Sequence, residues 1–466
     1  MRPHTKRFLA IVSTLVLVGQ GCTKAPSQEA IRASKPLTLN VWGVIDDFNV
    51  YEASFTAFRK AHPNVSFNFR RFRLEEYEKG LIDALAEDRG PDIFMIHNTW
   101  TNKYLTKITS MPVSTSIAYR VQQGRNTVWE LRDEPSITNR AFKSDFADIV
   151  QHDILRTVDV AEPGADRRNL QERLMGVPVG VDTLALYYNK DRLNAAGIPT
   201  PPQNWTEFAE QVRRLTKLDA QGALVQSAAG IGTTSNVERG TDILTALMMQ
   251  NGVEMAGPDG YPTFEKVPLA LKDQTETPPS WQAVQFYSDF ANPSKDTYTW
   301  DANQPNSLDA FIQGRTAFFF GYGYHYDTIR SRAPKLNLGT TALPQIEGFP
   351  VKNVGNYWYF AVSKKSANQV VAWNYLNRLA TPEYATEILT RANRPAARKS
   401  LLTGQLENER IGVFASQVLT AVSWYKGKNV ERMEAALGEL VTSVLQGVTI
   451  QKAMKFASEK VAQTIQ

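Results

Sequence analysis

The stretch that decides the fold is residues 176–190, which read GVPVGVDTLALYYNK. Its valine, leucine and tyrosine residues follow no helical period, and this predicts a long extended segment. Asp182 directly follows the apolar run of residues 177–181, where a buried carboxylate without a partner would be costly. We therefore expect the Asp182 carboxylate to face a cleft. Pairing with a nearby cation, or capping of a turn, is the alternative.

Toward the N-terminus, strand and helix patterns alternate. Apolar residues recur at every second position in 37–41 and 65–69, and at helical spacing in 51–58 and 74–85. Residues 91–96 form a short apolar run typical of a buried strand. This order predicts a mostly parallel sheet with helices on its faces. Ligands of such sheets lie beyond the carboxyl ends of the strands.

Downstream of the opening stretch, helical patterns dominate. Residues 204–207 have the form of a capping box, a short acceptor followed three positions later by a carboxylate. Further helices are predicted around 243–250 and 281–291 and after residue 367, with strands at 317–320 and 354–362. Residues 111–139 are irregular and mixed in charge, and we interpret them as a surface insertion.

The N-terminal residues have the pattern of a secretion signal. Three basic residues precede an apolar run at 8–18, which is too short to span a membrane but suits a secretory signal. The run ends just before Cys22, the only cysteine, in an arrangement that resembles a bacterial lipobox. We expect residues 1–21 to be cleaved as a lipoprotein signal peptide and residues 22–36 to form a lipidated cysteine and a tether. An ordinary signal peptide with an incidental cysteine is the alternative.

Charge and composition argue against several classes of protein. The formal net charge of +5 falls to +2 once the three basic residues of 1–21 are removed, so nucleic acid is not an expected partner. The five histidines show no pairing at metal-ligand spacing, and there is no Gly-x-Ser-x-Gly motif of a serine hydrolase. We expect no metal, no cofactor and no enzymatic activity.

Five segments together carry a resemblance to a known family. They are residues 176–190, 196–208, 283–294, 310–321 and 393–398. In their order and spacing, the chain resembles the family-1 extracellular solute-binding proteins, the group that contains maltodextrin-binding protein. Each segment alone is a weak signal.

The resemblance implies an α/β fold of the periplasmic-binding-protein type II, or Venus flytrap, class. Two lobes are joined by strands that cross between them, and the ligand lies in the cleft. On this interpretation lobe one comprises residues 37–181 plus 358–400, and lobe two comprises 184–354 plus 405–466.

A sugar presents an apolar face and a rim of hydroxyls, so its site needs aromatic platforms and a few placed polar groups. For each aromatic candidate the alternative is packing in a core or on one lobe, and for the aspartates it is capping or solvation. Asp46 competes with Asp47 for one place, and Arg394 is the only cation we would name for a phosphorylated ligand. The predicted ligand-binding residues are Trp42, Asp47, Asn98, Trp100, Asp182, Tyr322, Tyr324, Tyr357, Trp358 and Trp424.

The expected function is capture of a small solute, a mono- or oligosaccharide, by closure of the two lobes for an ABC importer. The partners would be permease subunits in the membrane, with a monomeric protein anchored through lipidated Cys22 to the outer face of the cytoplasmic membrane, or periplasmic. A membrane-anchored glycan-active enzyme and a ligand-sensing lipoprotein without a transporter are the alternatives.

Overall fold

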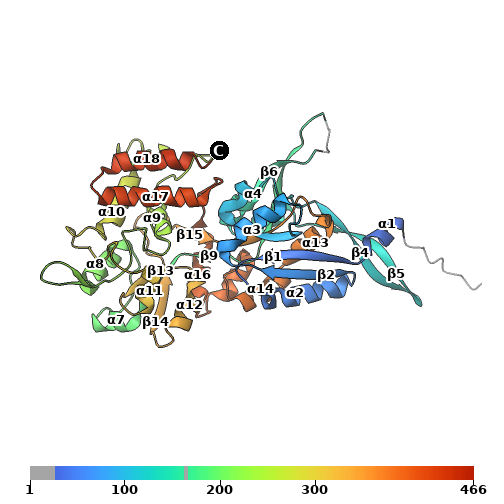
Figure 1. Ribbon diagram of the computed structural model, residues 1–466, viewed down its shortest axis with the longest axis horizontal. Helices are drawn as coiled ribbons and strands as arrows, with labels where there is room; N and C mark the ends of the chain where they lie inside the picture. The colour runs from blue at the N-terminus through green and yellow to red at the C-terminus, as the bar shows by residue number, and fades with distance from the viewer. Residues whose placement is uncertain (1–26, 162–165, 466) are drawn as a thin grey trace, which may run out of the picture.

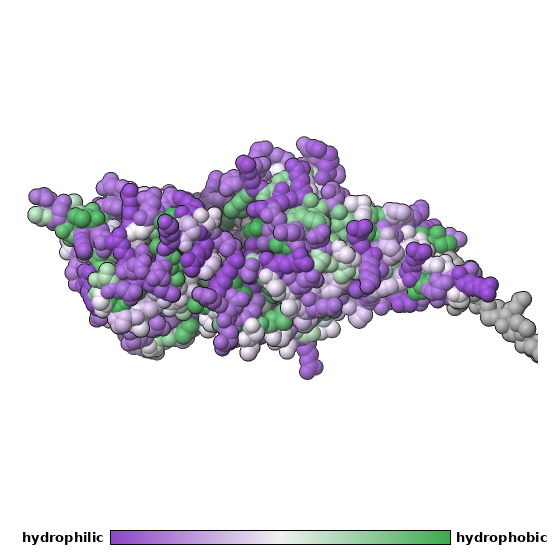
Figure 2. Space-filling view, turned by 90° about the horizontal axis from the view of Figure 1, so that it is seen from below, coloured by the Kyte–Doolittle hydropathy of each residue, from purple (hydrophilic) through white to green (hydrophobic). Residues whose placement is uncertain are grey.

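The computed structural model describes residues 27–161 and 166–465, so the prediction for Cys22 lies outside the described residues. The molecule is elongated and mixed α/β, with two lobes arranged along its long axis (Figure 1). Its surface is mostly hydrophilic, and hydrophobic residues gather toward the middle, where the lobes meet (Figure 2). Of the helices in the described ranges, none has the length and apolar character needed to cross a membrane.

The first lobe is built on a five-stranded sheet of order β2-β1-β3-β16-β8. β1, β2 and β3 are parallel, as the alternating pattern predicted, whereas β16 and β8 run antiparallel to their neighbours. Helices cover the sheet because each buries one apolar stripe and leaves its charges in water. The elements are β1 (Leu37–Gly43), α2 (Phe48–Ala61), β2 (Val65–Arg71), α3 (Leu74–Ala86), β3 (Ile93–His97), β8 (Val177–Pro178), β16 (Trp358–Val362), α13 (Gln369–Leu379) and α14 (Pro382–Ala392).

The second lobe holds a three-stranded antiparallel sheet of order β13-β10-β14. Asn204 is the predicted cap of α8: its side chain accepts from the Glu207 N–H at 2.8 Å. The Glu207 carboxylate accepts at 2.8 Å from the N–H of Gln203, one residue before the cap. The principal elements are β10 (Ala185–Asn189), α8 (Trp205–Leu215), α9 (Gly240–Gln250), α10 (Pro279–Asp289), β13 (Phe318–Gly321), α12 (His325–Arg332), β14 (Leu338–Ala342), α17 (Val430–Leu445) and α18 (Ile450–Ala462).

The extended segment predicted at 177–189 holds three short strands, and the strand predicted at 354–362 is interrupted at Tyr357. Each stretch is divided among sheets: β8, β9 (Asp182–Thr183) and β10 belong to three different sheets, and β15 (Asn353–Asn356) belongs to a different sheet from β16. β9 and β15 pair with each other, and β15 also pairs with β17 (Ala421–Val422). The chain must change direction between the sheets of the two lobes, so continuous apolar character does not give one continuous strand.

The apolar core is divided at the same places. One cluster of buried residues runs to Val181 and resumes at Tyr357, and the other extends from Leu184 to Val354 and resumes at Tyr425. The strands β9, β15 and β17 therefore lie where the two large clusters meet, with Val354 of β15 in the second cluster and Ala421 of β17 in the first. A third, smaller cluster of the second lobe includes Tyr187 and Phe319.

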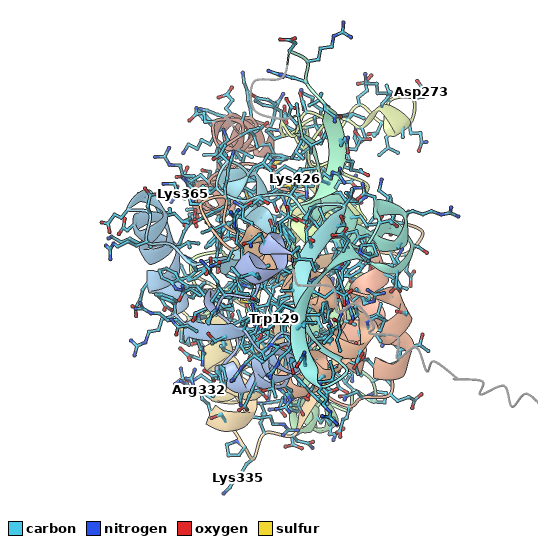
Figure 3. The ribbon with its side chains drawn as sticks, turned by 90° about the vertical axis from the view of Figure 1, so that its right-hand side faces the viewer. Trp129, Asp273, Arg332, Lys335, Lys365 and Lys426 are labelled. Atoms are coloured by element: carbon cyan, nitrogen blue, oxygen red, sulfur yellow. The ribbon has the colours of Figure 1, made fainter. Side chains whose placement is uncertain are left out.

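The segment 111–139 is not an irregular insertion. It contains a regular hairpin of β4 (Ser114–Gln123) and β5 (Asn126–Pro135), turned at Gly124 with a positive φ of 61°. Arg378 of α13 donates to Glu134 at 3.0 Å, which attaches the hairpin to the first lobe. Figure 3 looks along the molecule onto this end, with Trp129 of β5 toward the viewer. Most residues of this exposed hairpin are polar, so its sequence shows no clear alternation of apolar and polar positions.

The remaining elements are short connections and edges. They are α1 (Gln28–Ala33), α4 (Thr101–Tyr104), α5 (Asn139–Asp145), α6 (Asp148–Ile154), β6 (Leu155–Asp159), β7 (Leu170–Leu174), α7 (Lys190–Ala195), β11 (Lys217–Leu218), β12 (Leu224–Gln226), α11 (Ser307–Ile312), α15 (Lys399–Leu402) and α16 (Gly412–Gln417).

Candidate functional site

A cavity of about 740 Å³ lies between the two cores and takes its walls from both, and we call it the cleft cavity. Its volume is in the range of small-ligand sites. The first lobe contributes the carboxyl end of β3, and the second contributes the start of α9, the turn before α12 and one face of α17. Eight predicted residues line it: Asn98, Trp100, Asp182, Tyr322, Tyr324, Tyr357, Trp358 and Trp424.

Trp42 and Asp47 do not line the cleft cavity, and this corrects their predicted placement. The Trp42 ring packs on Phe72 with the ring centroids 4.4 Å apart. Asp47 precedes α2, and its exposed carboxylate lies 2.6 Å from Arg71. The cavity is lined instead by the neighbouring Asp46, because the chain turns between the two aspartates as it enters α2.

Asp182 lies at the cavity wall, but its carboxylate is engaged by the backbone. It accepts from the N–H groups of Thr183 and Gly323, both at 2.9 Å, and of Tyr324 at 3.2 Å. Burial raises the pKa of Asp182, and the backbone donors act in the opposite direction. The turn-capping alternative is therefore present in the structure, and the same carboxylate still borders the cavity.

Gly323 is required for this contact, because a Cβ at this position would lie 2.9 Å from the Asp182 Oδ1. Gly323→Ala is expected to lower the free energy of unfolding by about 1–2 kcal/mol, since the carboxylate must move away from its donors. Urea unfolding measures the change. Gly404→Ala, where no atom lies within 4 Å of an added Cβ, is the control. Equal effects of the two variants would contradict the role of the Asp182 contact.

A half-buried ionic group forms the second-lobe wall. Arg239, which precedes α9 with a left-handed φ of 54°, lies 2.9 Å from both Asp242 and Glu434. The buried Tyr322 hydroxyl donates to Asp242 at 2.6 Å. Burial raises the pKa of Glu434. Arg239, Asp242 and Glu434 were not predicted from the sequence. The charged residues before the apolar pattern of α9 were a signal of a helix start for Arg239 and Asp242.

The first-lobe wall carries a comparable group. The Asp46 carboxylate accepts from the Tyr51 hydroxyl at 2.8 Å and lies 2.8 Å from the Arg394 guanidinium. Arg394 lines the cleft cavity, but its charge is already matched by Asp46. This pairing removes the argument that Arg394 would favour a phosphorylated ligand.

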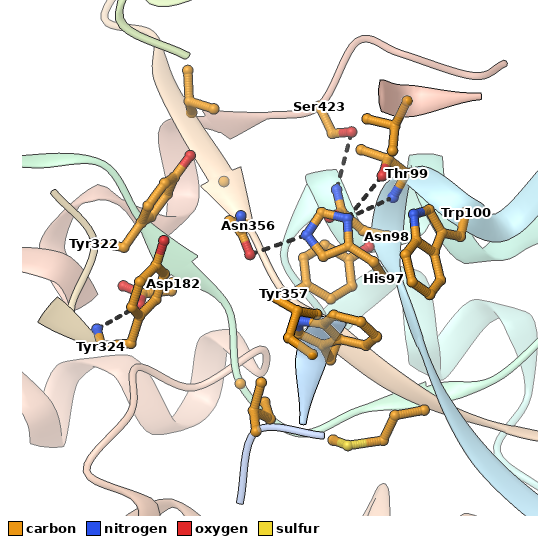
Figure 4. Close-up of a pocket in the computed structure, with 18 of the residues that line it drawn as sticks. His97, Asn98, Thr99, Trp100, Asp182, Tyr322, Tyr324, Asn356, Tyr357 and Ser423 are labelled. Carbon is orange, nitrogen blue, oxygen red and sulfur yellow. Dashed lines mark hydrogen bonds between the residues drawn. The ribbon is translucent and has the colours of Figure 1, made fainter. Parts of the chain in front are cut away.

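Asp153, which was not predicted from the sequence either, is a fully buried carboxylate behind the cavity wall. It accepts from the Asn98 amide at 3.0 Å and from the Tyr357 hydroxyl at 2.9 Å. Lys426, which follows β17, forms an ion pair with it. The Asn98 amide also donates to the Ser423 hydroxyl at 3.1 Å, a bond visible in Figure 4. Asp153 therefore orients two residues of the cavity and joins the first lobe to the segment after β17.

His97 provides another link between the lobes. Its Nε2 lies 3.1 Å from the Asn356 Oδ1, and its Nδ1 lies 2.8 Å from the Thr99 hydroxyl (Figure 4). The Thr99 N–H points at Nδ1, so Nε2 is the nitrogen that donates to Asn356. Burial lowers the pKa of His97 to about 4, and the imidazole is neutral at neutral pH.

Aromatic rings occupy both sides of the cavity. Trp100 and Trp358 meet edge to face at 5.2 Å on the first lobe. Tyr322 and Tyr324 stack at 5.7 Å on the second lobe, where Tyr324 is 46 % exposed. The partly buried Trp424 packs edge-on against Phe264 of the second core. Such rings, together with fixed carboxylate and amide groups, suit a ligand with apolar faces and many hydroxyls.

Sequence comparison shows that the chain is similar to bacterial binding proteins. The profile of the family described as bacterial extracellular solute-binding protein matches residues 42–386. A binding protein of Brucella abortus (strain 2308) is 25% identical over 219 residues, 45% of this chain and 47% of that protein. An ABC transporter-binding protein of Deinococcus radiodurans is 24% identical over 277 residues, 58% of this chain and 56% of that protein. The chain spans about half the length of the relatives it matches.

Solved structures share the fold over nearly the whole chain. The cyclic α-maltosyl-1,6-maltose binding protein from Arthrobacter globiformis matches with a TM-score of 0.70 at 16% identity, covering 92% of this chain and 99% of that one. The sugar-binding protein MalE of Xanthomonas citri matches with a TM-score of 0.67 at 17% identity, covering 92% and 97%. These similarities support the two-lobed fold.

Proposed function

The chain belongs to the family of bacterial extracellular solute-binding proteins, and we propose from this that it captures a carbohydrate in the cleft cavity for an ABC importer. The observation that carries the proposal is the cavity itself, which has aromatic rings and hydrogen-bonded polar groups on walls from both lobes. Solved proteins of the same fold are named as binding maltodextrins and cyclic maltosides. The Deinococcus relative is named as an ABC transporter-binding protein.

Capture follows from a ligand that contacts both walls. Such a ligand binds the closed arrangement more tightly than the open one, and it shifts the equilibrium toward closure. In this proposal the lobes are residues 37–181 with 358–400 and residues 184–354 with 405–466, and the strands β9 and β15 act as the hinge. The ligand-binding residues are the eight predicted ones that line the cavity, with Arg239 and Asp242 added.

The wider assignment is part of the same proposal. The protein is exported and monomeric, is anchored by lipid at Cys22, and delivers its ligand to permease subunits. Two carboxylates at the cavity already have partners within the protein. Asp182 accepts from backbone N–H groups, and Asp46 is paired with Arg394.

Thermal unfolding of residues 23–466 with mono- and oligosaccharides, polyols, amino acids and peptides tests the proposal. A ligand specific for the folded state stabilises it by roughly 2.7 kcal/mol at a hundredfold excess over Kd. We expect a rise in Tm with one carbohydrate class, and about tenfold weaker binding for Trp424→Ala because the ring is lost from the cavity wall.

Trp129→Ala is the matched control, because Trp129 lies on the hairpin β4–β5, away from the cavity (Figure 3). It is expected to bind the same carbohydrate as tightly as the wild type. A Tm shift with peptides or amino acids alone would overturn the carbohydrate assignment. Equal loss of binding in both tryptophan variants would remove the cleft cavity as the site.

A further inference from the structure

A second hollow of about 850 Å³ lies beside the cleft cavity, and we call it the second groove. Its first-lobe side is formed by α4, α6 and β6, and its second-lobe side by the end of α9, the loop after it and the C-terminal residues. Residues 422–424 line both hollows and form the wall that they share. The groove residues that carry the argument are Arg156, Met255, Lys352, Trp424, Lys426 and Lys428.

The two hollows have opposite charge. The cleft cavity is lined by eight carboxylate residues and two arginines. The second groove is lined by four lysine or arginine residues and a single carboxylate, Asp259. Like charges that line one hollow repel each other, and this lowers the stability of the fold. Each hollow also attracts ligands whose charge is opposite to its own. The second groove therefore favours an anion, whereas the cleft cavity does not.

The cations of the groove differ in how far they are neutralised. Lys426 is paired with Asp153. Arg156 donates only to uncharged oxygens, namely the Asn102 side-chain oxygen at 3.2 Å and the carbonyls of His152 and Leu155 at 2.8 Å. These bonds hold the guanidinium in place without cancelling its charge.

Lys352 and Lys428 are also without a carboxylate. Within residues 27–161 and 166–465, neither forms an ion pair, and Arg156 forms none either. Lys352 is half-buried and Lys428 is exposed. Three positively charged side chains thus line one groove, and none of them is paired with a carboxylate of the described residues.

The base of the groove is apolar. Val253 and Met255 are buried, and Met249 and Ile465 pack partly buried against the second core. The ring of Trp424 adds an aromatic face at the shared wall. A hollow with an apolar base and a cationic rim fits a small organic anion, with the anionic group toward the rim and the apolar part on the base.

We propose that the second groove binds a small organic anion, a carboxylate or a phosphate ester with an apolar body, at a site separate from the cleft cavity. Both anions share the chemistry that the groove recognises, a compact negative group beside an apolar ring or chain. The proposal does not depend on the captured solute, because no group of the cleft cavity other than the shared wall takes part.

The test is isothermal titration calorimetry of residues 23–466 with phenyl phosphate and with benzoate, using benzyl alcohol as the uncharged control. We expect binding of one or both anions and none of the alcohol. Binding should weaken several-fold when the ionic strength rises from about 0.05 to about 0.5 M, because rim charges are screened. Binding of phenyl phosphate alone identifies a phosphate ester as the natural ligand class, and binding of benzoate alone identifies a carboxylate.

Variants locate the anion. The double variant Lys352→Gln/Lys428→Gln is expected to weaken binding about tenfold, since two charge-assisted contacts are lost without touching the core. Lys452→Gln/Lys455→Gln, which changes two exposed lysines of α18 outside the groove, is the matched control and should bind as the wild type does.

A second readout is local to the shared wall. Anion binding should change tryptophan fluorescence in the wild type, and Trp424→Phe should abolish that change, because Trp424 is the one tryptophan among the described residues that line the groove. Absence of binding by either anion up to roughly 10 mM, well beyond ordinary weak affinities, would overturn the proposal. Equal weakening by the two double variants, or equal binding of benzyl alcohol, would overturn it as well. Since these titrations contain no carbohydrate, failure here leaves the test of solute capture unaffected.

Discussion

Asp153→Asn is expected to lower the free energy of unfolding by about 3 kcal/mol, the largest effect we expect from a single substitution in this protein. Asp153 is fully buried and accepts from Asn98 and Tyr357 while paired with Lys426. Removing one member of a buried ion pair leaves the other charge without compensation, and this costs several kcal/mol. An asparagine has the same size, so the loss reports charge and hydrogen bonding rather than a cavity. Urea unfolding followed by circular dichroism measures it.

Asp148→Asn is the control on the same helix, α6. Asp148 is exposed and pairs with Lys399 at 2.8 Å on the surface, where such a pair contributes at most about 1 kcal/mol. Asp153→Asn should also weaken ligand binding, because Asn98 and Tyr357 lose the acceptor that orients them in the cleft cavity. Similar losses of stability in the two variants would show that the buried contacts of Asp153 with Lys426, Asn98 and Tyr357 contribute no more than a surface ion pair.

Adding Lys426→Met to Asp153→Asn is expected to recover part of the lost stability. In the double variant no buried charge is left unpaired, so the two effects are not additive. A double-mutant cycle measures the coupling. Strict additivity would mean that the Asp153–Lys426 pair carries no interaction free energy.

Acidification from pH 7 to pH 4 is expected to destabilise the protein by about 3 kcal/mol through His97 alone. Burial holds the pKa of His97 at about 4, below the ordinary value of 6.5 that applies in the unfolded chain. Between these values the unfolded state binds a proton that the folded state does not, so stability rises with pH across this window. The contribution is complete above the unfolded pKa and is lost as the pH falls toward 4.

His97→Gln isolates this contribution. Glutamine keeps an N–H that can reach Asn356, whose oxygen lies 3.1 Å from the His97 Nε2, and it does not titrate. The difference in unfolding free energy between wild type and variant, measured at several pH values from 4 to 7, should therefore narrow or reverse as the pH falls. Parallel curves for the two proteins would contradict the lowered pKa, and imidazole NMR shifts of His97 measure that pKa directly.

Local sequence patterns predicted much of the fold correctly. The alternation of 37–41 and the helical spacing of 74–85 belong to β1 and α3, and the predicted cap at 204–207 begins α8. These signals depend on residues only two to four positions apart, so they survive without tertiary information. The end of β3 also brought Asn98 and Trp100 to the cavity, as the rule for carboxyl ends of strands predicts.

Local patterns could not predict features that depend on contacts between distant segments of the chain. The local apolar patterns of 177–189 and 354–362 do not show where each stretch passes from one sheet to the next, because residues on both sides of the passage are buried. Trp42 and Asp47 ended the right strand but lie against Phe72 and Arg71, whose positions the local pattern does not specify.

The sequence by itself determined the two-lobed α/β class, the order of the first strands and helices, and most of the aromatic residues that line the cleft cavity. The ionic groups at and behind the cavity wall depend on the tertiary structure alone. Asp153 meets Lys426 across 273 positions, and Arg239 meets Glu434 across 195. The same folding sorted acidic residues into the cleft cavity and basic residues into the second groove. The physical reason is range: periodicity records which face of an element is buried, whereas a charge finds its partner only after separate elements pack together.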